Sequence, residues 1–363
     1  MELKQLNLVI KPTLLCNAKC IYCHSLKPST IITKELLECV VSRYGDFTKK
    51  HGLKRGYIYW HGGEPMLPGE PFYSYFLKLK EKYLGHLELE NGMQSNMCLY
   101  KNEKTRDIVS RVLLDRHING CIDPFHATRF LNNGGSYLAD ALESMKLLRK
   151  DGFYVGMVYV IHKKSLEVVE RTYYYFKNLA VGDVLFHPLE EFDNDEYKLT
   201  PEDLGQYFKD LWDVWEADGY SLPITPFEDW YVHVTRGRPI TMCEYGLSPD
   251  TERSITVSPE GDLYPCPRYQ DRDDHRIGNI ADMTFDEAVA HPSSRIITDL
   301  KENQPAECQA CEFQSLCNSG CVITHDQSGK TQWCEGLKIF FEYLKTRNIK
   351  PIQRPLKASS CTC

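Results

Sequence analysis

The first 190 residues alternate short apolar runs with amphipathic stretches. Short apolar runs predict buried β-strands, and apolar residues spaced three or four apart predict helices that pack on them. The predicted strands are residues 6–15, 56–60, 87–93, 118–122, 154–161 and 184–186. The predicted helices are residues 34–44, 72–83, 103–116, 137–150 and 166–179. About six βα units of this kind predict an α/β fold with a helix-covered parallel sheet, either an open barrel or a doubly wound sheet.

The pattern changes near residue 240, where hydrophobic periodicity weakens and cysteine, glycine and proline become frequent. Pro259-Glu260-Gly261 lies between two short apolar runs, which predicts a β-hairpin over residues 253–265. Further helices are predicted at residues 201–218, 284–291, 292–300 and 335–346. We therefore predict an α/β domain at residues 1–235, a smaller domain at 236–347 and a mobile tail at 348–363.

The composition is that of a folded globular protein. Of the 363 residues, 42% are hydrophobic and 26% are charged, which excludes disorder over most of the length. No apolar run approaches the roughly 18 residues of a membrane span, and no secretory signal is recognisable, so we expect a cytoplasmic protein without a membrane partner. The net charge of −7, without a long basic block, argues against a nucleic-acid partner.

Fifteen cysteines are the unusual feature of the composition. Because the chain is long and the cysteine number is odd, metal ligation is favoured over disulfides. Cys16, Cys20 and Cys23 form a C-x3-C-x2-C loop after the first predicted strand. A structural zinc site needs four closed ligands, whereas an iron–sulfur cubane held by three cysteines keeps one iron open for a small molecule. The spacing favours the cubane and leaves zinc as the alternative.

A second motif, Trp60-His61-Gly62-Gly63-Glu64-Pro65, follows the second predicted strand. Together, CNAKCIYC and WHGGEP resemble the radical S-adenosylmethionine (SAM) superfamily. The resemblance implies a partial (β/α)6 barrel, in which the open iron chelates the amino and carboxylate groups of SAM and the GGEP segment contacts the methionyl amino group. The SAM contacts that it implies are Tyr22, Gly62, Gly63, Glu64, Pro65, Asn96, Arg129 and Leu189. One departure is Cys121-Ile122-Asp123-Pro124, where relatives often carry Ser-Ile/Leu-Asp-Gly.

A second cysteine array, which spans roughly residues 240–340, resembles the SPASM extension of radical SAM enzymes that modify peptides and proteins. The resemblance implies two auxiliary iron–sulfur clusters. One would be held by Cys308, Cys311, Cys317 and Cys334, and the other by Cys243, Cys266 and Cys321. A pair of zinc-ribbon-like sites is the alternative. The cluster of Cys243, Cys266 and Cys321 lacks a fourth cysteine. A tail that folds back could supply Cys361 or Cys363 as that ligand, and the alternative is that both are free thiols in the tail.

The resemblance implies an enzyme whose cofactors are SAM and three iron–sulfur clusters of the [4Fe–4S] type. An electron from a donor such as flavodoxin or ferredoxin enters the first cluster, SAM is cleaved, and a 5′-deoxyadenosyl radical abstracts hydrogen from an unactivated C–H bond. The open first cluster and the GGEP segment favour this enzyme over a non-catalytic iron–sulfur electron carrier, which needs neither.

The SPASM resemblance favours a peptide or protein side chain as substrate. Anaerobic sulfatase-maturating enzymes, which form formylglycine, have a proposed proton acceptor, an aspartate directly after the Gly-x4-Cys cysteine. Pro267 stands at that position here. We therefore predict maturation of a ribosomally made precursor peptide through a crosslink, a thioether or an epimerised centre, with sulfatase maturation as the alternative.

Candidate substrate-contacting acids are Glu190 and Glu191, with His187, just beyond the sixth predicted strand. The alternative is that these acids are solvated on a loop. The first barrel strand begins almost at residue 1, which leaves no room for an N-terminal leader-binding domain. Leader recognition would then fall to the catalytic domain or to a separate leader-binding protein.

Overall fold

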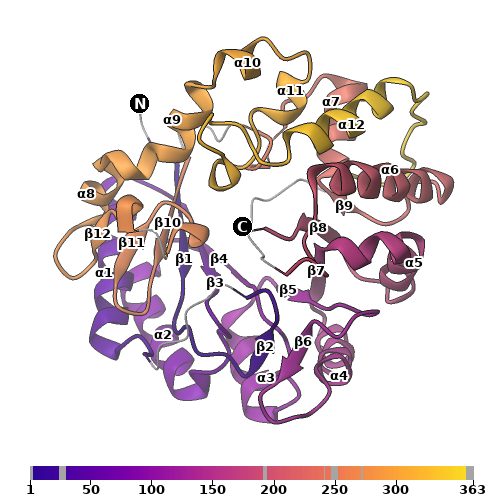
Figure 1. The fold of residues 1–363 in the computed structure, drawn as a ribbon. Helices are drawn as coiled ribbons and strands as arrows, with labels where there is room; N and C mark the ends of the chain where they lie inside the picture. Colours follow the sequence, from indigo (N-terminus) through magenta and orange to yellow (C-terminus); the bar gives the residue numbers. More distant parts are fainter. Residues whose placement is uncertain are drawn as a thin grey trace.

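The computed structural model describes residues 3–23, 30–190, 194–240, 242–246, 252–270 and 273–356. Six strands form its framework: β1 (Gln5–Ile10), β3 (Arg55–Trp60), β4 (Glu88–Met93), β5 (His117–Cys121), β7 (Tyr154–Ile161) and β8 (Val184–Pro188). Parallel pairing joins β1 to β3, β3 to β4, β5 to β7 and β7 to β8. A parallel bridge between Gln94 and Asn119 connects β4 to β5, so the strands follow one another in sequence order around an open barrel (Figure 1).

Helices lie on the outer side of this barrel (Figure 1). They are α1 (Lys34–Lys50), α2 (Gly69–Leu84), α3 (Glu103–Val112), α4 (Tyr137–Lys150), α5 (Val169–Asn178) and α6 (Pro201–Ala217). Side chains at their N-termini fix where several begin, because Thr33, Ser136 and Thr200 each accept a hydrogen bond from a backbone N–H of the first turn. The arrangement confirms the predicted partial barrel of six βα units.

The end of β3 is held by aromatic packing. Trp60 is fully buried, and its ring meets those of Phe72, Tyr73 and Phe76 of α2 nearly edge-on, at centroid distances of 6.1, 5.2 and 4.7 Å. Burial of one such side chain stabilises the fold by about 2–3 kcal/mol. The segment that follows Trp60 therefore leaves the sheet from a rigid point.

The C-terminal part continues the barrel sheet. Strand β10 (Glu252–Val257) pairs in parallel with β1 along its whole length. Strands β11 (Asp262–Tyr264) and β12 (Gly278–Asn279) follow in antiparallel order. The hairpin predicted around Pro259-Glu260-Gly261 is confirmed, and Gly261 takes the left-handed backbone conformation that its turn requires, with φ +89°.

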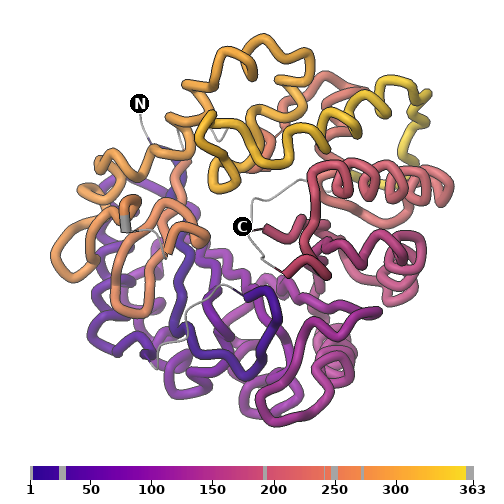
Figure 2. Tube along the Cα trace, viewed as in Figure 1, coloured from indigo at the N-terminus to yellow at the C-terminus, as the bar shows by residue number. Residues whose placement is uncertain are grey.

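The other end of the C-terminal part packs on α6. Its helices are α7 (Phe227–Arg236), α8 (Phe285–Ala290), α9 (Ile296–Glu302), α10 (Ala306–Gln309), α11 (Gln314–Cys317) and α12 (Cys334–Lys345). Gly205 of α6 faces Gly336 of α12 so closely that a Cβ on Gly336 would lie 1.8 Å from the carbonyl oxygen of Pro201. Figures 1 and 2 show the orange and yellow segments reaching from β10, beside β1, across to α12, beside α6. They span the open side of the barrel.

Several short elements complete the fold. The strands are β2 (Ala18–Cys20), β6 (Arg129–Leu131) and β9 (Ile224–Thr225). The 3-10 helices are η1 (Lys163–Val168), η2 (Pro267–Tyr269), η3 (Asp273–His275), η4 (Pro292–Arg295) and η5 (Val322–Thr324). Periodicity did not predict these strands, because two or three residues are too few to show a repeat.

Several predicted elements have different limits in the structure. The strand predicted over residues 6–15 ends at Ile10, since Pro12 has no N–H to give to a neighbouring strand. The first helix runs on to Lys50, and α3 ends at Val112. Part of the segment predicted as a mobile tail is anchored, because Ile352 is buried and its N–H donates to the Tyr231 hydroxyl at 2.9 Å. Cys361 and Cys363 lie outside the described residues.

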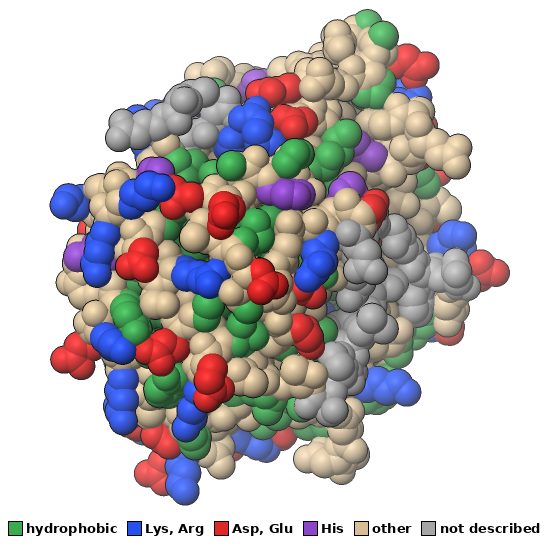
Figure 3. Space-filling model, turned by 90° about the vertical axis from the view of Figure 1, so that its left-hand side faces the viewer, with side chains coloured by type: hydrophobic (Ala, Val, Ile, Leu, Met, Phe, Trp, Pro, Cys, Tyr) green, Lys and Arg blue, Asp and Glu red, His purple; other side chains and the backbone are tan. Residues whose placement is uncertain are grey.

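The surface carries both signs of charge. Figure 3 shows basic and acidic side chains interspersed on one face of the molecule. Within the described ranges, no helix has the length and apolar character needed to cross a membrane.

Candidate active site

The three-cysteine loop is shaped by a two-stranded sheet. Cys20 ends β2 and pairs with Arg129 of β6, and the Ile21 N–H donates to the Thr128 carbonyl at 2.9 Å. A turn then brings the Cys23 N–H to 3.2 Å from the Cys20 carbonyl oxygen. Cys16, Cys20 and Cys23 line the same cavity, so this loop could hold one metal cluster against the barrel.

Gly62 and Gly63 fit the cysteine loop closely. A Cβ on Gly62 would lie 2.3 Å from the Thr13 carbonyl oxygen, and one on Gly63 would lie 2.3 Å from that of Leu15. The Gly63 N–H donates to Thr13 at 3.0 Å and the Glu64 N–H donates to Leu15 at 2.8 Å. Only glycine allows this approach of two backbones, so the GG pair fixes the GGEP segment to the loop that carries Cys16.

Glu64 has an internal role in this geometry. Its carboxylate is fully buried and accepts hydrogen bonds from the Met66 N–H, the Ser95 hydroxyl and the Asn96 N–H, at 3.0, 2.8 and 2.8 Å. Burial raises the pKa of this carboxyl to about 7. Neither Glu64 nor Pro65 is among the described residues that line the cavity. Glu64 therefore joins the end of β3 to the end of β4 and positions Asn96.

Polar side chains surround the cysteines. Asn96 donates through Nδ2 to Asn17 Oδ1 at 2.7 Å and to Cys16 Sγ at 3.7 Å. Arg129 donates through Nη1 to Cys20 Sγ at 3.4 Å, and its guanidinium lies 5.3 Å from the centre of the Tyr22 ring. Of the predicted SAM contacts, Tyr22, Gly62, Gly63, Asn96, Arg129 and Leu189 line the cavity.

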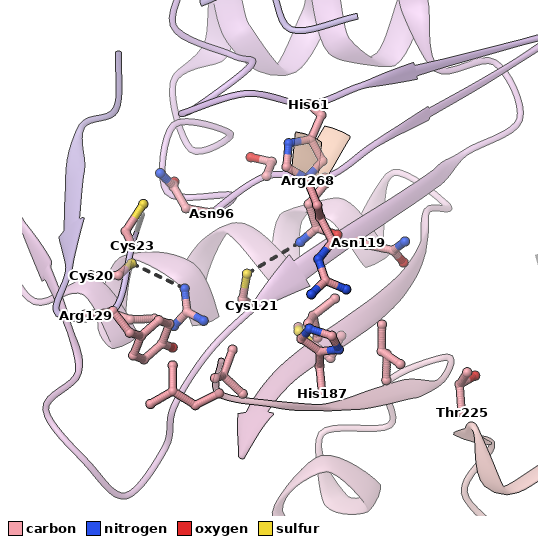
Figure 4. Close-up of a pocket in the computed structure, with 18 of the residues that line it drawn as sticks. Cys20, Cys23, His61, Asn96, Asn119, Cys121, Arg129, His187, Thr225 and Arg268 are labelled. Carbon is pink, nitrogen blue, oxygen red and sulfur yellow. Dashed lines mark hydrogen bonds between the residues drawn. The ribbon is translucent and has the colours of Figure 1, made fainter. Parts of the chain in front are cut away.

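The cavity has a volume of about 440 Å³ and draws residues from both parts of the chain. Figure 4 places Cys20, Cys23 and Arg129 on one side of the close-up, His187 and Arg268 on the other, and Cys121 between them. Sequence reasoning missed His61, Cys121 and Arg268 as lining residues. His61 lies inside the quoted WHGGEP motif and Cys121 at the noted departure, but Arg268 carried no signal.

His61 is a partly buried neutral imidazole at this cavity. Its Nδ1 accepts a hydrogen bond from the Gly62 N–H at 2.7 Å. Burial, reinforced by the nearby Lys11 ammonium, lowers the pKa of His61 to about 3. Lys11 itself donates to the Pro267 carbonyl at 2.8 Å, which links the end of β1 to the turn after Cys266.

Four charged or titratable side chains form the wall opposite the cysteine loop: His187, Glu190, Glu244 and Arg268. Arg268 donates to Glu190 and lies 3.6 Å from Glu244. His187 lies 3.2 Å from Glu244 and 3.6 Å from Glu190. Burial alone would lower the pKa of His187, but Glu244 and Glu190 outweigh it and raise that pKa. The predicted Glu190 is thus paired at the cavity wall, and Glu191 lies outside the described residues.

A different buried group fixes the loop that leads to Arg129. Asp123 accepts from His162 Nε2 at 2.9 Å and from the Thr128 hydroxyl at 3.1 Å, and His126 Nδ1 lies 3.6 Å from it. These three acidic and imidazole groups are close enough to bind a cation. Both Asp123 oxygens already accept hydrogen bonds, including those from the Phe125 and His126 N–H groups, so we interpret the group as a structural clamp.

The second cysteine array divides into two groups. Cys308, Cys311, Cys317 and Cys334 line one cavity of about 390 Å³. Between Cys317 and Cys321, the residues Asn318, Ser319 and Gly320 all have positive φ, of 46°, 58° and 73°, so the chain reverses sharply and Cys321 points elsewhere. Cys266 and Cys321 share a small apolar cluster. No disulfide joins the cysteines in the described ranges.

The chain is similar to known iron–sulfur enzymes. The SPASM family, described as an iron–sulfur cluster-binding domain, matches residues 249–312. A cysteine-type anaerobic sulfatase-maturating enzyme of Clostridium perfringens is 27% identical over 95% of this chain and 97% of its own. A serine-type counterpart from Klebsiella aerogenes is 24% identical over 94% and 85%.

Solved structures of SAM-binding enzymes are also similar to this chain. The structure of native anSMEcpe with bound AdoMet superposes with a TM-score of 0.81 at 25% identity, covering 94% of this chain and 97% of that one. Streptococcus suis SuiB bound to S-adenosylmethionine has a TM-score of 0.60 at 14% identity over 91% and 76%. The second likeness is one of fold alone.

Proposed function

We propose that this chain, a radical SAM enzyme with a C-terminal SPASM domain, oxidises a side chain of a peptide or protein held in the barrel cavity. One observation carries the proposal. A single cavity is lined on one side by the three-cysteine loop with Gly62 and Gly63, and on the other by charged side chains that include Glu244 and Arg268 of the C-terminal part. When bound there, the iron–sulfur cluster and SAM supply a carbon radical that removes a hydrogen atom from the substrate.

The residues of the loop suit those cofactors. Cys16, Cys20 and Cys23 would hold a cluster with one open iron. Gly62 and Gly63 allow a ligand to approach the backbone, while Asn96 and Arg129 offer hydrogen-bond donors beside the cysteines. The four cysteines that share the second cavity support a fully ligated auxiliary cluster. Cys243, Cys266 and Cys321 would hold the other auxiliary cluster.

Oxidation of a cysteine side chain to formylglycine is the first candidate reaction. The full-length similarity to the cysteine-type enzyme of Clostridium perfringens supports it and places it ahead of the crosslinking or epimerisation that the sequence favoured. The reaction removes a hydrogen atom from Cβ, a proton from the thiol and one electron, which leaves a thioaldehyde; water then hydrolyses the thioaldehyde to the aldehyde and releases hydrogen sulfide. The radical takes the hydrogen atom, and an auxiliary iron–sulfur cluster would accept the electron.

Glu190 is the proposed acceptor for the proton. Pro267 has no titratable group, so the group that accepts the proton must come from another position. Glu190 lines the cavity, and Arg268 connects it to Cys321 by donating to the carboxylate and, through Nη1, to Sγ at 3.2 Å. This arrangement supports the proposal, because Glu190 would then lie beside a proposed ligand of the electron-accepting cluster.

A second candidate is modification of a ribosomally made precursor peptide through a crosslink, a thioether or an epimerised centre. Pro267 favours it, because the acid expected for sulfatase maturation is missing from that position. Flavodoxin or ferredoxin would serve as electron donor in either case. A separate leader-binding protein belongs only to this second candidate.

The test uses reconstituted protein with SAM and a low-potential reductant under anaerobic conditions. A sulfatase-derived peptide is offered in cysteine, serine and alanine versions. We expect 5′-deoxyadenosine in all three assays and an aldehyde, trapped with a hydroxylamine probe, from the cysteine peptide alone. 5′-Deoxyadenosine without aldehyde would favour the second candidate. No 5′-deoxyadenosine from protein with its full iron content would contradict both.

A further inference from the structure

Lys301 is a buried lysine between the two groups of SPASM cysteines. It lies in α9 with 3% of its surface exposed. Its ammonium donates to the Glu244 carbonyl at 2.9 Å and to the Asn318 carbonyl at 3.3 Å. Glu244 follows Cys243 in the chain, and Asn318 follows Cys317. One side chain therefore ties together backbone next to a proposed ligand of each auxiliary cluster.

The charges around Lys301 match this position. The cysteine thiols near enough to act electrostatically on its ammonium are those of Cys243, Cys321 and Cys317. Cys317 belongs to the group of four around the second cavity, while the other two belong to the group of three. A buried ammonium is costly unless negative charge faces it. Thiolates that carry iron–sulfur clusters supply that charge, together with the nearby carboxylate of Glu244.

We propose that Lys301 is a positioning residue that raises the reduction potentials of both auxiliary clusters; this rests on the proposed function. Reduction of such a cluster by one electron adds one negative charge. A fixed positive charge nearby favours the reduced state, and the effect is large where solvent is excluded. Hydrogen bonds and charges just outside the ligands are among the means by which a protein adjusts a metal centre.

The consequence concerns the electron that leaves the substrate. A higher potential makes its transfer to an auxiliary cluster more favourable. Among the described residues that line the two cavities, Lys301 does not appear, so it contacts neither the proposed substrate nor the SAM site. Loss of its charge should therefore change electron acceptance and leave SAM cleavage intact.

The test is an EPR-monitored redox titration of the full-length, iron-loaded protein, as wild type and as Lys301→Met and Lys301→Arg. We expect the potentials of both auxiliary clusters to fall in the methionine variant and to return toward wild type in the arginine variant. The potential of the cluster held by Cys16, Cys20 and Cys23 should stay unchanged. The amount of 5′-deoxyadenosine that the variant forms should also stay unchanged. If the methionine variant loses iron, the neutral Lys301→Gln, which can still donate to a carbonyl, must show the same fall.

Lys338 provides the matched control. It lies near Cys334 and Cys311, but its side chain is 44% exposed and paired with Glu335, so water and salt screen its charge. Lys338 also lines the four-cysteine cavity, so Lys338→Met should shift the potential of that cluster less than Lys301→Met does and leave the potential of the other auxiliary cluster unchanged. Unchanged auxiliary potentials in iron-replete Lys301→Met, or equal shifts of all three clusters, would overturn the inference. Wild-type protein without auxiliary clusters would instead contradict the proposed function.

Discussion

The glycines of the GGEP segment have no room for a side chain. In Gly63→Ala, the new Cβ would lie 2.3 Å from the Leu15 carbonyl oxygen, so the cysteine loop must move. We expect the variant to lose about 1–3 kcal/mol of unfolding free energy and, on reconstitution, about a third of its iron. Gly85→Ala is the control, because the nearest atom to its Cβ is 3.2 Å away. Full iron content in Gly63→Ala would contradict this close fit.

Burial of Glu64 makes folding depend on pH. Its pKa is raised to about 7 in the folded protein, from 4.5. Between these values the folded state binds more protons than the unfolded state, so this group's contribution to stability is full below about pH 4.5 and is lost as pH rises through 7. In Glu64→Gln this pH dependence should disappear. Urea unfolding of both proteins from pH 5 to 8 measures the unfolding free energy at each pH. If this free energy changes with pH equally in both proteins, the raised pKa of Glu64 is contradicted.

Glu190 should affect product formation more than SAM cleavage. In Glu190→Gln the proposed proton acceptor is lost, and we expect the modified peptide to fall about 100-fold, with 5′-deoxyadenosine reduced less than about twofold. Glu190→Asp should recover part of the product. The control, Glu196→Gln, changes an exposed acid. Normal product from Glu190→Gln would show that another group accepts the proton.

At the scale of elements, the contact between α6 and α12 holds the SPASM part to the barrel. Gly336→Val would drive a side chain into the Pro201 carbonyl and force the two helices apart. We expect about 3 kcal/mol lower unfolding free energy in denaturant titrations. Glu335→Ala, at an exposed position one residue earlier, should change it by less than about 0.5 kcal/mol.

The β1–β10 pair explains why the two parts act together. Strand β10 extends the barrel sheet, and the hairpin that follows it leads to Cys266 and then to Arg268, which lines the cavity. Lys11, next to β1, donates to Pro267 in the same turn. The turn that carries Cys266 is therefore held by the barrel sheet.

For the whole molecule, the iron should be shared equally among three clusters. Reconstituted wild-type protein should hold about twelve irons as three cubanes. Replacing Cys16, Cys20 and Cys23 by alanine should remove about four irons and all SAM cleavage. Replacing Cys308, Cys311, Cys317 and Cys334 should also remove about four irons. Zinc as the main metal, without charge-transfer absorption, would contradict the iron–sulfur assignment.

Chain-local patterns were enough to predict a helix-covered parallel sheet of about six βα units, and the family resemblance favoured the barrel over a doubly wound sheet. Strand and helix periodicities lie within single elements, and the C-x3-C-x2-C and GGEP spacings lie within single loops, so both can be read along the chain. The grouping of SPASM cysteines rested on a family resemblance, and the four-cysteine cavity agrees with it. The limits of β1 and α1 were harder to predict, because element ends depend on capping and pairing partners.

Contacts between distant parts of the chain were decided only by the tertiary structure. Arg268 meets Glu190 across 78 residues, and Lys301 meets Glu244 across 57. Glu64, predicted to contact SAM, is turned inward because Ser95 and Asn96 at the end of β4 satisfy its carboxylate. The sequence determined which chemical groups are available and how they are spaced along each loop. Sheet pairing and burial determined which of them face one another, because those depend on strands and helices far apart in the chain.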